Sequence, residues 1–346
     1  MKALALTFPG LSDVCATEIK QLIGKTCKEL SEAALFEADP EDIIAVCYRA
    51  QSVIRVILVL SEGTAEELSV PKEYLTGTIS VDAKSTTKAN EIAARIPAQK
   101  VYKNADIPLY AHNEGAHWWL GIDLTGDIGK RDYRIFIGSE VLTGPTAFGV
   151  LQLAGYEPKH TLLDPVCRAG TIAIEAALSA AHFPVRSYSK DKIRFKLLKF
   201  DDTVFTKHDK KIRETTGTII ALSEQFPHVQ AARKNAKIAG IIKAIDFSRT
   251  ETEWLDIKFE KNSIDRIVTQ PIEFNTTFPV EKAKKIASLF FERASAILKK
   301  NGTIGLVLRQ GKDEYLAAAQ QKFSLDHERI IMQGKEAWNV LVFSRT

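Results

Sequence analysis

The sequence predicts an α/β fold whose C-terminal half is a doubly wound, mostly parallel sheet. Two observations support this prediction. From residue 146 onward, short apolar runs alternate with helical patterns of ten or more residues, as in strands joined by helices. One of these runs ends in an acidic residue and a turn of small residues that leads into a helix. Such junctions bind ligands at the carboxyl edge of parallel sheets.

The first 60 residues predict a small α+β domain. Residues 3–7 form a short apolar run typical of a strand, and residues 11–22 have the spacing of an amphipathic helix that ends at Gly24. Residues 43–49 predict a second helix. Residues 52–60 are rich in β-branched side chains and predict a second strand.

A second α+β module is predicted over residues 61–125. Its expected elements are a strand at 79–83, a helix at 87–95 and a strand at 117–124. Residues 126–145 are predicted to be a linker.

Basic side chains collect in the second module and the linker. They are Lys84, Lys88, Lys100, Lys130, Arg131 and Arg134. A solvated charged face is the common cause of such a pattern, and contact with nucleic-acid phosphates is the alternative. The net charge of +4 permits a polyanionic partner without requiring one.

The C-terminal half is predicted to contain four strands and four helices. The expected strands are 161–163, 218–222, 264–269 and 303–309, and the expected helices are 146–154, 172–181, 227–239 and 280–300. A charged insertion at 190–213 interrupts this order, and we expect Phe195, Phe200 and Phe205 to pack it against the rest of the chain.

The turn after strand 161–163 is the main candidate for a binding site. It consists of Asp164, Pro165, Val166, Cys167, Arg168, Ala169, Gly170 and Thr171. Small residues before a helix N-terminus let a ligand approach free N–H groups. With Gly170 alone, the turn lacks the G-x-G-x-x-G pattern of dinucleotide sites, so an adenosine nucleoside is favoured. Glu224 follows the next strand, either as a surface glutamate or as an acceptor for ribose hydroxyls.

Other classes of protein are disfavoured. No apolar run is long enough for a membrane span, and the opening residues do not have the pattern of a signal peptide, so a cytoplasmic location is expected. The four cysteines include no C-x-x-C pair, and no metal site is therefore predicted.

Five segments resemble one family, the THUMP-domain RNA guanine-N2 methyltransferases. Residues 162–177 (LLDPVCRAGTIAIEAA) resemble its cofactor motif, L-L-D-P-F/M-C-G-S-G-T-I-x-I-E-A-A. Residues 231–240 resemble the helix A-R-x-N-A-x-x-A-G, and residues 123–126 with 130–134 resemble the connector D-T-T-G…K-R-G-Y-R. Residues 8–11 resemble the opening P-G-L-E. The likeness extends in order over nearly the whole chain.

The resemblance implies an N-terminal ferredoxin-like domain at 1–60, a THUMP RNA-binding domain at 61–125, a linker at 126–145 and a Rossmann-fold methyltransferase domain at 146–346. It implies S-adenosylmethionine as cofactor, tRNA or otherwise rRNA as partner, and a monomer. The implied cofactor-binding residues are Asp164, Pro165, Cys167, Arg168, Ala169, Gly170, Thr171, Glu224, Gln225 and Glu251. The six basic residues above are the implied RNA contacts.

The sequence departs from the family pattern at positions of the cofactor motif and of the catalytic motif. Arg168 replaces the first glycine of the cofactor motif, and Gln270-Pro271-Ile272-Glu273-Phe274 replaces N-P-P-Y or D-P-P-Y. In the family motif, an amide or carboxylate oxygen and a backbone carbonyl accept the two N–H bonds of a guanine amine, and an aromatic ring stacks on the base. Gln270, Pro271 and Phe274 are the implied catalytic residues here.

Three functions are therefore weighed. The first is an active methyltransferase that forms N2-methylguanosine in tRNA. The second is a non-catalytic RNA-binding member of the family, which Arg168, Gln270 and Glu273 favour. The third, a small-molecule methyltransferase, does not account for the N-terminal half.

Overall fold

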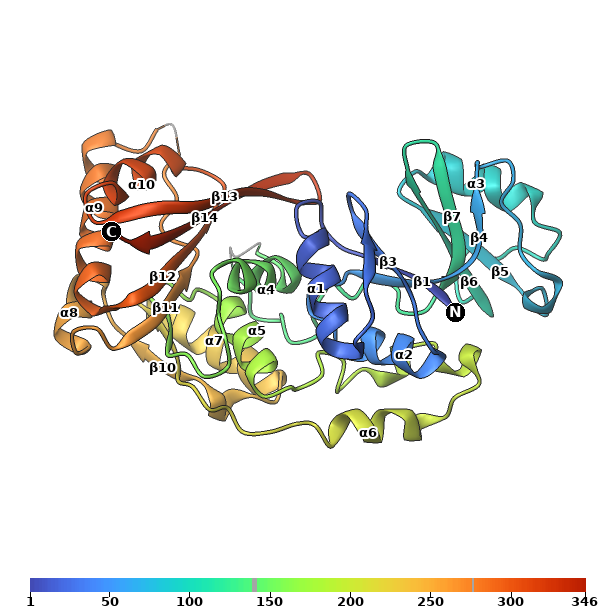
Figure 1. Cartoon of the computed structure of the whole chain (residues 1–346), viewed down its shortest axis with the longest axis horizontal. Helices are drawn as coiled ribbons and strands as arrows, with labels where there is room; N and C mark the ends of the chain where they lie inside the picture. The colour runs from blue at the N-terminus through green and yellow to red at the C-terminus, as the bar shows by residue number, and fades with distance from the viewer. Residues whose placement is uncertain (139–141, 276) are drawn as a thin grey trace.

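In the computed structural model, which describes residues 1–138, 142–275 and 277–346, the strands form two sheets of seven (Figure 1). The N-terminal sheet has the order β2-β3-β1-β4-β7-β6-β5. Its strands are β1 (Lys2–Leu6), β2 (Cys27–Glu29), β3 (Ala33–Glu37), β4 (Arg55–Gly63), β5 (Ile79–Ala83), β6 (Ile107–Glu114) and β7 (His117–Asp123). Its helices are α1 (Ser12–Ile23), α2 (Pro40–Arg49) and α3 (Thr86–Arg95).

The predicted boundary at residue 60 falls inside a strand. β4 pairs with β1 on one side and with β7 on the other, both antiparallel. The two predicted N-terminal modules therefore share one continuous sheet. The strand also begins later than predicted, because the backbone N–H of Ser52 donates to the Glu18 carboxylate (2.9 Å) instead of joining the ladder.

The C-terminal sheet has the order β10-β9-β8-β11-β12-β14-β13. Its strands are β8 (Leu162–Asp164), β9 (Ile219–Ser223), β10 (Asp246–Arg249), β11 (Ile264–Thr269), β12 (Leu298–Leu308), β13 (Phe323–Gln333) and β14 (Glu336–Arg345). Its helices are α4 (Gly144–Leu153), α5 (Thr171–Ala180), α7 (Phe226–Ile238), α8 (Leu255–Lys258), α9 (Val280–Ile297) and α10 (Lys312–Ala319). The pairings among β8 to β12 are parallel, as the sequence predicts.

Two features of this sheet differ from prediction. Helix α9 ends at Ile297 rather than at residue 300, because Leu298 already pairs with Ile264 in the ladder. The antiparallel hairpin β13–β14 was not predicted. It extends from the C-terminal sheet toward α1 (Figure 1), where Met332 N donates to Pro9 O (3.0 Å).

The charged insertion after α5 packs under the N-terminal sheet domain. It includes α6 (Thr206–Asp209), which lies below α2 (Figure 1). Phe195 and Phe205 are buried, as predicted, and Phe205 lies 4.8 Å from the ring of Tyr48 on α2. Phe200 is partly buried against the same core. The aromatic residues thus fix the insertion to the first domain.

Candidate functional site

The candidate site lies at the carboxyl ends of three neighbouring strands. β8 lies between β9 and β11, and both pairings are parallel. The segments that follow these strands, residues 164–171, 223–226 and 269–274, therefore open at one edge of the sheet. This is the edge at which open α/β sheets bind ligands.

The loop after β8 is held from both sides. The buried Asp164 carboxylate accepts a hydrogen bond from Thr269 Oγ1 (2.6 Å) on β11. The N–H of Cys167 donates to Leu222 O (2.7 Å) on β9. Beneath the loop, buried Asn235 on α7 donates to Ala169 O (3.0 Å). The loop therefore has a defined shape without a ligand.

Gly170 is the position of the loop that requires glycine. Its φ of +85° is left-handed, and it is the N-cap of α5. A Cβ at this position would lie 2.8 Å from the Cβ of Ala232 on α7. Without a Cβ, Gly170 can lie close against α7. The first N–H groups of α5, which begins at Thr171, then lie next to the loop.

Three predicted cofactor residues follow β9 and β10, which lie one and two strands away from β8. Glu224 and Gln225 follow β9 and are exposed, and Glu251 follows the adjacent β10 and is also exposed. Arg249 Nε donates to the backbone oxygen of Glu224 (2.9 Å), which joins the two strand ends. The side-chain carboxylates at 224 and 251 are thus presented at the same edge as Gly170.

Arg168 connects the loop after β8 to the end of β11. Its backbone has a φ of +45°, in the left-handed region, which costs a non-glycine residue about 1 kcal/mol. Its Nη2 donates to Pro271 O (3.1 Å). Buried Nε of the same guanidinium has no partner among the residues that the structure describes. The side chain therefore spans the space between the two loops.

The segment after β11 is rigidly held. Gln270 is buried, and its Oε1 has no hydrogen-bond partner in the described part of the chain. Glu273 accepts hydrogen bonds from the Arg309 backbone N–H (2.7 Å) and from Arg309 Nη2 (3.0 Å). Tyr315 Oη donates to Ile272 O (2.9 Å).

Phe274 differs from its predicted role. Its ring is only 5% exposed and stacks on Tyr315, with ring centroids 5.3 Å apart. It belongs to the core beneath α9 and is not open to stack on a base, contrary to the prediction.

The predicted RNA contacts divide into two groups. Lys84, Lys100 and Lys130 are exposed, and Lys88 is partly exposed with its ammonium on Glu91 (2.7 Å). Arg134 is half-buried. The prediction for Arg131 is wrong, because its guanidinium is buried.

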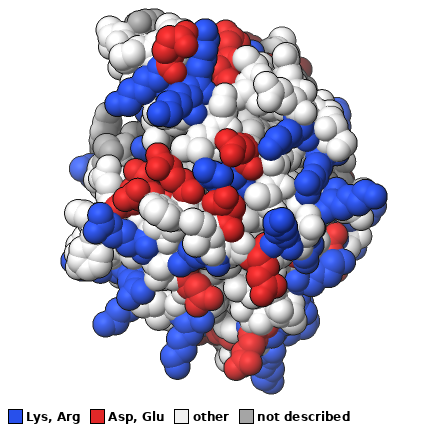
Figure 2. Space-filling view, turned by 90° about the vertical axis from the view of Figure 1, so that its left-hand side faces the viewer, with Lys and Arg blue, Asp and Glu red and all other residues white. Residues whose placement is uncertain are grey.

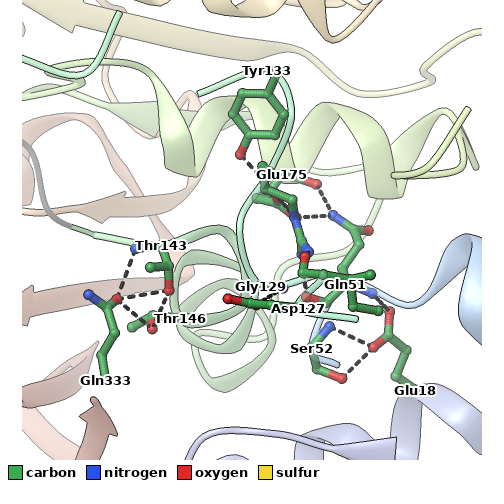
Figure 3. Close-up of polar contacts among 12 residues, drawn as sticks. Glu18, Gln51, Ser52, Asp127, Gly129, Tyr133, Thr143, Thr146, Glu175 and Gln333 are labelled. Carbon is green, nitrogen blue, oxygen red and sulfur yellow. Dashed lines mark hydrogen bonds and ion pairs between the residues drawn. The ribbon is translucent and has the colours of Figure 1, made fainter. Parts of the chain in front are cut away.

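Arg131 belongs to a buried polar junction between the domains, in which Figure 3 labels Gln51, Tyr133 and Glu175. Its Nε donates to Glu175 Oε1 (2.8 Å) on α5, and Tyr133 Oη donates to the same oxygen (2.8 Å). Gln51, from the segment between α2 and β4, donates from Nε2 to Glu175 Oε2 (2.7 Å). The linker thus forms part of an interdomain core.

Glu18 on α1 completes this junction. Its carboxylate accepts hydrogen bonds from the backbone N–H groups of Gln51 (2.7 Å) and Ser52 (2.9 Å). Burial raises the pKa of Glu18, and these hydrogen bonds oppose the rise. The roles of Glu18, Gln51 and Glu175 were not predicted, since no local pattern links positions so far apart in the sequence.

A second contact ties the hairpin to the linker. Gln333 Oε1 accepts hydrogen bonds from Thr143 N (2.9 Å) and Thr146 Oγ1 (3.0 Å), as Figure 3 shows. Arg329 on β13 pairs with Asp13 of α1 (2.7 Å). The hairpin and linker therefore clamp α4 and α1 together.

Charges of both signs are interspersed on the end of the molecule that Figure 2 shows. Ion pairs account for part of this pattern, as in Lys284–Glu281 (3.0 Å) and Lys312–Glu328 (2.7 Å). This end therefore lacks the single-sign field that attracts a nucleic acid strongly.

None of the helices in the described part of the chain combines the length and apolar character needed to span a bilayer. Within the same residues, no group of three or more His, Cys, Asp or Glu side chains is arranged to hold a metal ion.

Comparison with known families matches residues 131–336 to the family described as RMKL-like, methyltransferase domain. Two similar curated proteins are named tRNA (guanine(6)-N2)-methyltransferase. That of Methanocaldococcus jannaschii is 30% identical over 62% of this chain and 57% of its own length. That of Archaeoglobus fulgidus is 24% identical over 65% of this chain and 54% of its own. The chain thus spans little more than half the length of these relatives.

Solved structures share the fold along the whole chain. TrmN from Thermus thermophilus has a TM-score of 0.72 at 20% identity, covering 100% of this chain and 99% of that one. SMU.472, solved in complex with SAH, has a TM-score of 0.77 at 16% identity, covering 100% of this chain and 98% of that one.

Proposed function

The chain belongs to the family of RMKL-like methyltransferase domains, and from this premise we propose that it is an S-adenosylmethionine-dependent RNA methyltransferase. We propose N2-methylguanosine in tRNA as its product, as the names of the archaeal relatives suggest. One observation carries the proposal. The loop of Gly170, the exposed Glu224 and the pair Gln270–Pro271 meet at one edge of the sheet.

The residues present fit the nucleoside part of the donor. The left-handed Gly170 lets the loop lie close against α7, where an added Cβ would collide with Ala232, and the N-terminus of α5 presents free N–H groups beside the loop. Glu224 offers an exposed carboxylate that fits a pair of ribose hydroxyls, with Gln225 and Glu251 nearby in the sheet order. When bound, the donor would supply a methyl group carried on a sulfonium.

Gln270 and Pro271 fit the target amine. A guanine N2 amine has two N–H donors and needs two acceptors. Gln270 Oε1 is a buried acceptor without a partner in the described residues, and the carbonyl of Pro271 follows it in the chain. The Gln270 side chain and the Pro271 backbone carbonyl would orient the amine, and orientation supplies much of the rate enhancement in such a transfer.

The second candidate function is RNA binding without methyl transfer. Arg168 favours it, since its guanidinium already donates a hydrogen bond to the carbonyl oxygen of Pro271. The burial of Phe274 favours it as well, because no ring in the segment is then free to stack on a base. In this function the exposed Lys84, Lys100 and Lys130 and the partly exposed Lys88 would contact RNA.

Two measurements separate these functions. Isothermal titration with S-adenosylmethionine should give heat in the micromolar to millimolar range. Incubation of an unmodified tRNA transcript with labelled donor, followed by nucleoside analysis, should give N2-methylguanosine. Donor binding without a labelled nucleoside would leave RNA binding alone as the function, and absence of both binding and label would sink the enzyme proposal.

The domain assignments belong to the same proposal. Residues 1–60 would be the ferredoxin-like part, 61–125 the THUMP part and 146–346 the methyltransferase domain, with the first two fused into one sheet. We also propose that the protein acts in the cytoplasm, where RNA is modified, and as a monomer. A sedimentation velocity experiment at micromolar concentration tests the last point.

A further inference from the structure

The side chain of Arg168 joins the two loops between which the proposed methyl transfer would occur. It leaves the donor loop after β8 and ends on the carbonyl of Pro271, after β11. The same carbonyl is one of the two acceptors proposed for the target amine. While Arg168 Nη2 donates to it, this acceptor is engaged within the protein.

The backbone at Arg168 is in a strained conformation that contacts with its surroundings must maintain. A φ of +45° is a conformation that L-residues other than Asn or Asp rarely adopt, and such strain persists where surrounding contacts hold it. The guanidinium is close enough to act on partly buried His228 and on buried Tyr315. Burial and then the charge of Arg168 lower the pKa of His228, and the same charge opposes the rise that burial imposes on the pKa of Tyr315.

The acceptor on the other side is fixed. Glu273 is tied to both the backbone and the guanidinium of Arg309, and Tyr315 holds Ile272 O at 2.9 Å. Pro271 lies within this fixed segment. The contact between the two loops can therefore be released by rotation of the Arg168 side chain, without a rearrangement of the segment after β11.

The closed arrangement leaves hydrogen-bonding capacity unused. Arg168 Nε and Gln270 Oε1 are both buried and have no partner among the described residues. An unpaired buried donor or acceptor destabilises the arrangement that contains it. The contact thus forms at the cost of leaving Arg168 Nε unpaired, as suits a switch between two states.

We propose that Arg168 is a latch that keeps the methyl-transfer site closed and opens when RNA binds. The proposal rests on the function proposed above. A phosphate oxygen is a charged acceptor and binds a guanidinium more strongly than a neutral carbonyl does. An RNA phosphate that draws Arg168 away frees the carbonyl of Pro271 for the target amine. Because Arg168 belongs to the loop after β8, the same movement would also take its positive charge away from the sulfonium of the donor. RNA binding would thereby strengthen donor binding.

The test is donor binding, measured by isothermal titration with S-adenosylmethionine and with S-adenosylhomocysteine, in the presence and absence of an unmodified tRNA transcript. For the natural chain, the transcript should tighten binding of S-adenosylmethionine about tenfold. Arg168→Gly and Arg168→Ala should bind it about tenfold tighter without RNA and respond little to the transcript. Their gain should be larger for S-adenosylmethionine than for S-adenosylhomocysteine, because only the sulfonium repels a guanidinium.

A matched control is Lys199→Gly. Lys199 is exposed, has a φ of +64° and lies in the insertion, away from the site. This change relieves the same kind of backbone strain and should leave donor binding unchanged. Arg168→Ala keeps the strain and removes the guanidinium, which separates the two effects.

The outcomes distinguish the latch from the proposed function. Equal donor affinity for the natural chain and both Arg168 variants, with methylated RNA formed by all three, would overturn the latch and leave the function intact. Weaker binding by the variants would make Arg168 a donor ligand and also overturn the latch. Failure of every folded variant to bind either nucleoside would overturn the function and the latch together.

Discussion

The Nε of Arg131 and the Oε1 of Glu175 lie 2.8 Å apart inside the junction of the two domains, and both side chains are almost fully buried. Burial lowers the pKa of Arg131, but Glu175, with smaller contributions from Tyr133 and Glu18, raises it above its ordinary value, so the guanidinium stays charged. The pair links the linker to α5, directly after the donor loop. The position of the site relative to the first domain therefore depends on this charge pair. Neither segment's sequence alone predicts the pair.

Glu175→Gln should destabilise the protein by about 3–5 kcal/mol, because it leaves the buried guanidinium of Arg131 without its counter-charge. Urea unfolding followed by circular dichroism measures the loss. The double variant Arg131→Met with Glu175→Gln should lose less than the sum of the two single changes. Additive losses would show that the two side chains act independently.

Gly170→Ala should cost about 1–3 kcal/mol and abolish donor binding, since a Cβ would lie 2.8 Å from that of Ala232 at a φ of +85°. Gly115→Ala is the matched control, with a φ of +59° and nothing within 4 Å of the added atom. Thermal melting and titration with S-adenosylmethionine compare the two. Equal effects of both changes on donor binding would remove Gly170 from the site.

The combined variant Arg168→Gly, Gln270→Asn and Glu273→Tyr should methylate a tRNA transcript faster than the natural chain. It restores the family residues at these three positions and brings the amide closer to the backbone, and a displacement of about 1 Å can change the rate on the order of 10²-fold. Glu273→Tyr also removes the contact to Arg309, so a melting curve must accompany the assay. A folded triple variant that binds no donor contradicts the account.

Lys100→Gln should weaken RNA binding and reduce the slope of log K against log salt by about 0.7–0.9, the range for loss of one phosphate contact on a single strand or a duplex. Lys284→Gln is the control. Lys284 is exposed on α9 and paired with Glu281, and its loss should leave the slope unchanged. Fluorescence anisotropy over a salt series gives both slopes. The same slope for both variants would place the RNA elsewhere.

Asp265→Asn should reduce the dependence of unfolding free energy on acid pH. Burial raises the pKa of Asp265, but Lys299 (2.9 Å) and Thr161 N (2.9 Å) lower it by more, so its folded pKa is below the ordinary value. A lowered carboxyl pKa stabilises the fold above about pH 4, and this contribution is lost as pH falls through the folded value. Urea midpoints between about pH 6 and 2.5 should show a shallower decline for the variant.

Local periodicity was sufficient for much of the C-terminal domain. β11 has the residues predicted for it, and α7 begins one residue before its predicted start. β11 has a clear signal because it is a short run rich in β-branched residues, and α7 because its buried positions recur at the spacing of a helix. β13 and β14 do not, because their side chains alternate little between buried and exposed. Their place depends on pairing with each other and with β12.

The site residues were predictable only as far as their neighbours in sequence define them. Gly170 follows from its position between a strand and a helix. Arg131 did not, because a buried partner 44 residues away decides whether a basic side chain faces solvent or the core. Phe274 was misjudged for the same reason, since Tyr315 of α10 covers its ring.

The strand β4 runs through the middle of the N-terminal sheet and crosses the predicted domain boundary. It pairs with β1 over residues 55–58 and with β7 over residues 57–63, with a bulge between Val59 and Ser61, and this pairing opposes a hinge at residue 60. With the buried junction fixing this sheet to α5, exposed side chains such as Lys100 lie at a set distance from the strand ends of the methyltransferase domain. The protein would then act as a ruler. The nucleotide that reaches the site would be chosen by its distance along the RNA from the point of attachment, and not only by its base.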